Sequence, residues 1–98
     1  MRRGVASTLL ALALLAGCSA GGAGEASRVV VQGAGPDEFL KLRTGPGLGY
    51  RIVLGLPDGT QLIRRDCVTE GGQLWCRVSL SAAPQITGYV SADYLSAI

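Results

Sequence analysis

The chain has 98 residues, 48% of them hydrophobic, with nine basic and seven acidic residues and a formal net charge of +2. A chain of this length is sufficient for one small domain. The sequence contains no histidine, which excludes Ser-His and Cys-His nucleophilic catalysis and histidine acid–base chemistry. The carboxylates are scattered, and no pair has a spacing that suggests a glycosidase site. The composition therefore predicts a protein that is not an enzyme, and it points to no cofactor.

The beginning of the sequence has the layout of a secretory signal. Two arginines (Arg2 and Arg3) precede residues 5–16, which carry no charge, and the run ends in LAGC at residues 15–18. A positive segment, an apolar segment and small residues before a cleavage point are typical of such signals. The uncharged run is shorter than the ~20 residues that a transmembrane helix needs. The alternative is an ordinary secretory peptide that holds a cysteine by chance.

Residues 15–18 resemble the lipobox of bacterial lipoproteins, in which the cysteine is acylated and becomes the first residue after cleavage. The resemblance implies a signal peptide at 1–17, lipidation at Cys18, and a protein held by that lipid in the bacterial cell envelope, facing the periplasm. The residue after the cysteine is Ser19 and not an aspartate. This choice of residue resembles the outer-membrane address of enterobacterial lipoproteins, so the resemblance implies the outer membrane if the host is Gram-negative. Cleavage removes two of the nine basic residues and leaves seven against seven acidic ones. A net charge near zero argues against a nucleic-acid partner.

Residues 18–27 are predicted to form a flexible tether behind the acylated cysteine. The sequence SAGGAGEAS at 19–27 is small, polar and rich in glycine, so it has nothing to bury. A chain of this length has a typical span of roughly 15–18 Å. The folded part is therefore expected to stay close to the membrane that holds the lipid.

From residue 28 onward the sequence predicts an all-β domain. Short apolar runs alternate with turn clusters rich in glycine and proline, which is typical of a small barrel or sandwich and not of βαβ units. No stretch of this region has a convincing helical period. The expected strands are, in chain order, residues 29–31, 39–42, 50–56, 60–68, 73–80 and 87–90.

Five motifs of this region are similar to those of bacterial SH3 domains. They occur in the family's order and spacing at residues 42–47 (LRTGPG) with Tyr50, 57–60 (PDGT), 75–78 (WCRV), 88–90 (GYV) and 93–95 (DYL). Leu42 replaces the usual valine, and Tyr89 stands where tryptophan is commoner. The resemblance covers residues 28–98 and implies an SH3-like barrel of about five to seven short, strongly bent antiparallel strands.

Four aromatic residues at motif positions are candidates for a ligand groove: Tyr50, Trp75, Tyr89 and Tyr94. In SH3-like barrels, aromatic side chains commonly line a shallow groove that accepts an extended peptide. The same rings could instead fill a core that is poor in large side chains. Arg43 is a fifth candidate, which either faces a ligand or hydrogen-bonds the carbonyl groups of the neighbouring turn.

The remaining motif residues are expected to build the fold. Gly45 and Gly47 would let the chain reverse tightly around Pro46, and Gly59 suits a turn position with positive φ. The expected core includes Leu62, Val78, Val90 and Leu95.

Cys67 and Cys76 lie on the two predicted strands that flank the Gly71-Gly72 turn. Because the signal directs the chain to an oxidising compartment, we expect a disulfide across this hairpin. Metal binding is the alternative, but two cysteines without a histidine cannot complete a four-ligand zinc site within one chain. Cys18 is then the odd cysteine, and the lipid accounts for it.

Together these features predict a lipid-anchored binding module of the bacterial envelope. By analogy with relatives of the same fold, the expected ligand is peptidoglycan or another extended peptide. The alternative is a non-catalytic accessory or structural subunit that docks onto another envelope protein.

Overall fold

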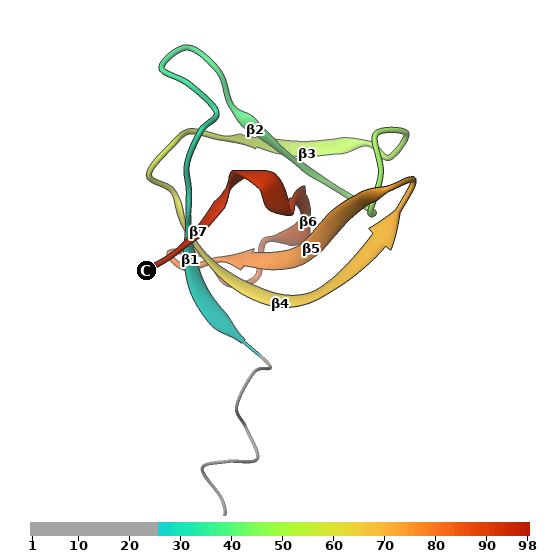
Figure 1. Ribbon diagram of the computed structural model, residues 1–98. Coiled ribbons are helices and arrows are strands. Elements are labelled where there is room, and N and C mark those ends of the chain that lie inside the picture. Colours follow the sequence, from blue (N-terminus) through green and yellow to red (C-terminus); the bar gives the residue numbers. More distant parts are fainter. Residues whose placement is uncertain (1–25) are drawn as a thin grey trace, which may run out of the picture.

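The computed structural model of the protein describes residues 26–98. The predicted signal peptide, Cys18 and residues 18–25 of the predicted tether lie outside the described residues. The described part is one seven-stranded antiparallel sheet in the order β3-β2-β6-β5-β4-β1-β7. The sheet curves strongly, so that β2 and β3 lie above β4 and β5 in the view of Figure 1. The all-β prediction is confirmed.

Six of the seven strands coincide with predicted runs to within two residues at each end. β1 begins at Ser27, the last residue of the predicted tether, because Ser27 already pairs with Arg64 of β4. The strands are β1 (Ser27–Val31), β2 (Leu40–Arg43), β3 (Ile52–Leu56), β4 (Gln61–Glu70), β5 (Gln73–Leu80), β6 (Thr87–Ser91) and β7 (Leu95–Ala97).

A single turn of 3-10 helix, η2 (Ala92–Tyr94), and strand β7 follow β6, where the sequence predicts no element. Ser91 caps the turn, because its Oγ accepts a hydrogen bond from the backbone N–H of Asp93 at 3.3 Å. The chain then runs back along β1, with Val29 opposite Ala97. Elements of three residues are too short to produce a periodic pattern, which is why the sequence did not indicate them.

The core lies on the inner face of the curved sheet. Side chains alternate between the two faces of a strand, so Leu40 and Leu42 of β2 point inward while Lys41 is exposed. Of the four residues expected in the core, three have exposed fractions of zero and Leu95 packs against them partly buried. The buried cluster consists of Val29, Val31, Leu40, Leu42, Leu56, Leu62, Cys76, Val78 and Val90.

The predicted disulfide joins β4 to β5. Cys67 and Cys76 lie directly opposite each other in the register of the two strands and are covalently linked. Cys76 belongs to the buried cluster, whereas Cys67 is exposed. The disulfide therefore ties the rim of the hairpin to the core.

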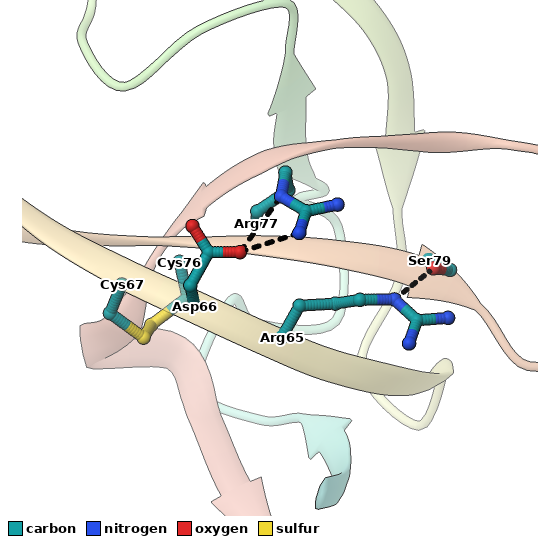
Figure 2. Close-up of polar contacts among 6 residues, drawn as sticks. All are labelled: Arg65, Asp66, Cys67, Cys76, Arg77 and Ser79. Carbon is teal, nitrogen blue, oxygen red and sulfur yellow. Dashed lines mark hydrogen bonds and ion pairs between the residues drawn. A yellow bond between two sulfur atoms is a disulfide. The ribbon is translucent and has the colours of Figure 1, made fainter. Parts of the chain in front are cut away.

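A β-bulge lies beside the disulfide, where β4 contributes Arg65 and Asp66 opposite Arg77 of β5. An extra residue of this kind bends a strand and increases its local twist. Figure 2 shows the polar contacts that occupy the bulge: Arg77 forms an ion pair with Asp66, with its Nε donating at 2.9 Å. Arg65 donates from Nε to the Oγ of Ser79 at 3.1 Å, which satisfies a hydroxyl that is 1% exposed.

Asp58, in the turn between β3 and β4, fastens that turn to the loop between β1 and β2. Its carboxylate accepts hydrogen bonds from the backbone N–H groups of Ala34 at 2.8 Å and Gly35 at 3.1 Å. The next residue, Gly59, has φ of +95°, as the sequence predicts, and donates its N–H to the carbonyl of Val31 at 2.8 Å. The two backbone N–H groups hold the pKa of Asp58 below its ordinary value of 3.8.

We expect this contact to make stability depend on acidic pH. Because the native pKa of Asp58 is lower than that of the unfolded chain, its contribution is complete above the unfolded value and is lost as the pH falls through the native pKa. Urea unfolding of the unsubstituted protein and of Asp58→Asn should be measured at pH values from 7 downward. The free energies of unfolding of the two proteins should differ at neutral pH and converge in acid. If the two free energies of unfolding differed by a constant amount at every pH, the charge of the Asp58 carboxylate would contribute nothing to stability.

Candidate functional site

A groove crosses the surface between the loop that joins β2 to β3 and the far end of the β4–β5 hairpin. It consists of two adjoining hollows of about 340 and 520 Å³. Both hollows are lined by Leu48, Trp75, Ser91 and Tyr94, so they form one continuous feature. In Figure 1 the loop and the hairpin end lie on the same side of the molecule.

Trp75 of β5 lies between the two hollows. It is adjacent to Cys76, which faces the core, and therefore lies on the opposite face of the strand. Its exposed fraction is only 5%, because the elements around the groove cover most of the ring. Only a small part of the ring is open to a ligand, and because the ring is already fixed, a contact there costs little further conformational freedom.

Arg43 holds the β2–β3 loop in position beside the groove. Its Nη1 donates hydrogen bonds to the carbonyl groups of Leu48 and Tyr50, both at 3.1 Å. The side chain of Leu48, which is 77% exposed, thereby stays at the groove. Arg43 itself lines the smaller hollow. The hydrogen bonds to turn carbonyls are the structural role that the sequence allowed for, and Arg43 acts here as a positioning residue.

The structure brings together Arg43, Trp75 and Tyr94 but places the other two candidates elsewhere. Tyr50 is 49% exposed and lines neither hollow. Tyr89 is partly buried on β6, opposite Arg43, and lines neither hollow. Motif position alone does not distinguish the rings that line the groove from those that support it.

Tyr50 instead supports the loop from within. A Cβ atom added to Gly45 would overlap atoms of the Tyr50 ring, and one added to Gly47 would lie 3.4 Å from it. Neither glycine has a positive φ, so the tight reversal expected at Pro46 does not depend on left-handed backbone. Gly45 is needed because the ring packs directly against it, whereas a side chain at Gly47 would only touch the ring.

Four further lining residues were not among the groove candidates suggested by the sequence. Phe39 precedes β2, Leu48 lies in the β2–β3 loop, Glu70 ends β4 and Asp93 belongs to η2. An exposed leucine in a glycine-rich loop is the one sign that could have identified Leu48. The two carboxylates are far apart in the sequence, and only the folded chain brings them to the same hollow.

Charge is distributed unevenly along the groove. Glu70 and Asp93 line the larger hollow, which has no basic residue in its lining. The smaller hollow is lined by Lys41 and Arg43 together with Glu38. The groove therefore has an acidic end and an end with a net positive formal charge.

The described residues contain neither a cluster of metal-ligating side chains nor a membrane-spanning helix. Within residues 26–98, no group of three Cys, Asp or Glu side chains is arranged to hold a metal ion. No helix in the same part of the chain is both long enough and apolar enough to cross a membrane.

Comparison with known proteins agrees with the fold. Residues 38–96, more than half of the chain, match the family model of the bacterial SH3 domain. A search of curated proteins and a search of solved structures each returned no significant match. The matched segment runs from the residue before Phe39 to β7 and includes the groove lining apart from Ala34. The chain belongs to the bacterial SH3 domain family.

Proposed function

We propose that the protein is a lipid-anchored binding module of the bacterial envelope, whose SH3 domain recognises peptidoglycan or another extended peptide. Bacterial SH3 domains form a family of peptidoglycan- and peptide-binding modules. The observation that carries the proposal is the continuous groove over Trp75 and Tyr94. A long, shallow groove with an aromatic floor suits an extended chain better than a compact small molecule.

The proposal also covers location and chemistry. The LAGC sequence at residues 15–18 supports lipidation at Cys18 and a position facing the periplasm, on the outer membrane if the host is Gram-negative. The absence of histidine from the whole sequence supports a role in binding and not in catalysis. The disulfide between Cys67 and Cys76 suits an oxidising compartment of this kind.

Binding by the groove can be tested with purified peptidoglycan. Leu48→Ala and Tyr94→Ala should each weaken co-sedimentation of the soluble domain with sacculi by roughly 5-fold, the effect of losing an important contact residue. Leu74→Ala is the matched control, because Leu74 is also exposed (45%) but lines neither hollow. Equal binding by all three variants would show that sacculi do not occupy the groove.

A second candidate function is an accessory subunit that docks onto another envelope protein. The feature that favours it is β3, which lies at one edge of the sheet and exposes Ile52, Val53 and Leu54 by 47%, 42% and 39%. Exposed apolar edge strands are unusual because they invite pairing with another chain. Failure to sediment with sacculi, combined with cross-linking in cells to one protein, would favour this candidate.

Lipidation is tested separately. Cys18→Ala should leave the protein without its acyl chains, so we expect it to move from the membrane fraction to the soluble fraction of lysed cells. Mass spectrometry of the purified proteins would show the acyl groups on the unsubstituted chain and not on the variant. Retention of Cys18→Ala in the membrane fraction would overturn the lipobox interpretation.

A further inference from the structure

Resting on the proposed function, we infer that the groove selects a peptide by its primary ammonium group, which lies in the acidic hollow between Glu70 and Asp93. The cationic end of the groove, at Lys41 and Arg43, fixes the direction in which the peptide lies. The ligand class is therefore an extended peptide with a free amino group at one end of the bound segment and a carboxylate toward the other.

The two carboxylates are available to a ligand. Glu70 and Asp93 are both exposed and both line the larger hollow. Asp66 and Arg77 form the one ion pair found within residues 26–98. No cation of that part of the chain therefore neutralises Glu70 or Asp93, and a cationic group of a ligand would meet uncompensated negative charge.

The segments that carry these carboxylates are tied together. Gln73, beside the hairpin turn that follows Glu70, donates from Nε2 to the Oγ of Ser91 at 2.9 Å. The same Oγ accepts the backbone N–H of Asp93 at 3.3 Å. The β4–β5 hairpin end and η2 are thus connected through one hydroxyl, which holds together the backbone segments that carry Glu70 and Asp93.

The opposite end of the groove has a net positive formal charge, because Lys41 and Arg43 line it together with Glu38. The Nζ of Lys41 donates to the carbonyl of Phe39 at 3.0 Å, and Arg43 donates to loop carbonyls. Neither side chain is paired with a carboxylate of the described residues. A peptide whose carboxylate lies at this end and whose ammonium lies at the other would satisfy both ends, whereas the reversed peptide would place like charges together.

The floor of the acidic hollow also favours an ammonium group. Trp75 and Tyr94 line it beside the two carboxylates, and a cation close to an aromatic face is attracted by the ring. Because Glu70 and Asp93 are exposed, each ion pair contributes little affinity by itself. Together, the two carboxylates discriminate between peptides with and without an ammonium group and orient the bound peptide. This is the usual contribution of complementary charge at a binding surface.

The experiment compares untreated sacculi with sacculi whose free amino groups have been acetylated with acetic anhydride. The unsubstituted domain should bind the acetylated preparation roughly 5-fold more weakly. The double variant Glu70→Gln, Asp93→Asn should bind both preparations equally, and as weakly as the unsubstituted domain binds acetylated sacculi. Asp37→Asn is the matched control, because Asp37 is exposed but lines neither hollow, and it should behave like the unsubstituted domain.

The outcomes separate this inference from the proposed function. Equal binding of the unsubstituted domain to both preparations would overturn the ammonium site while leaving peptidoglycan binding intact. Failure to bind either preparation would overturn both. Lys41→Gln should weaken binding to both preparations by the same factor, since it acts at the other end of the groove. If Lys41→Gln bound untreated and acetylated sacculi equally, the direction assigned to the bound peptide would be contradicted.

Discussion

Replacing Cys67 with alanine is expected to lower the free energy of unfolding by roughly 2–3 kcal/mol, because the disulfide closes a loop of about ten residues in the unfolded chain. This is a large fraction of the stability of a small domain. Cys67 is the better of the two positions to change. It is exposed, whereas Cys76 belongs to the buried cluster and can remain there as a free thiol, which packs as a small apolar group.

Urea unfolding with and without a reducing agent provides the measurement and its control. The unsubstituted protein should lose stability when reduced and then resemble Cys67→Ala, while the variant itself should not respond to the reducing agent. The reduced protein and the variant should share one denaturant slope, steeper than that of the oxidised protein, because an unfolded chain without the cross-link exposes more surface. A variant as stable as the oxidised protein would show that the hairpin is already held by its own strand pairing and core contacts.

The second large effect is expected at Gly88 of β6, where alanine should cost roughly 1–3 kcal/mol through overpacking. A Cβ atom at this buried position would lie 2.7 Å from the backbone carbonyl oxygen of Arg43 and 2.8 Å from the Cγ of Leu42. The first is main chain and the second is fully buried, so neither can move away easily. Relief requires β6 to move away from β2, where Arg43 pairs with Tyr89.

Gly49→Ala is the matched control for this substitution. Gly49 is exposed, has no positive φ, and a Cβ atom there would meet nothing within 4 Å. Alanine at this position should leave stability unchanged or raise it by a few tenths of a kcal/mol, because it restricts the unfolded chain. If thermal unfolding gave the same midpoint for Gly88→Ala and Gly49→Ala, the close approach of β6 to β2 would be contradicted.

The strands could be predicted because local patterns determine them. The run from Gln73 to Leu80 is rich in apolar residues and follows two glycines, Gly71 and Gly72, that both have positive φ. Each of these signals lies within a few residues of the element that it defines. In contrast, η2 and β7 depend on the cap at Ser91 and on pairing with β1. Their stability comes from partners that are distant in the sequence.

The candidate groove could be predicted only in part. The motif positions suggested Trp75, Tyr94 and Arg43, which line the groove. They also suggested Tyr50 and Tyr89, which line neither hollow. A motif records that a ring is required at a position but does not record what the ring contacts. For Tyr50 the contact is the glycine-rich loop itself.

The sequence by itself determined the all-β class, the bacterial SH3 resemblance, the disulfide and six of the seven strands. These follow from patterns that are local or that involve a hairpin of adjacent strands. Only the tertiary structure decided which side chains line the groove and where its charges lie. Glu70 and Asp93 reach one hollow because β5 pairs with β6, with Trp75 opposite Ser91, which places the end of the β4–β5 hairpin next to η2. No short-range pattern encodes such a meeting, since it depends on the packing of the whole domain.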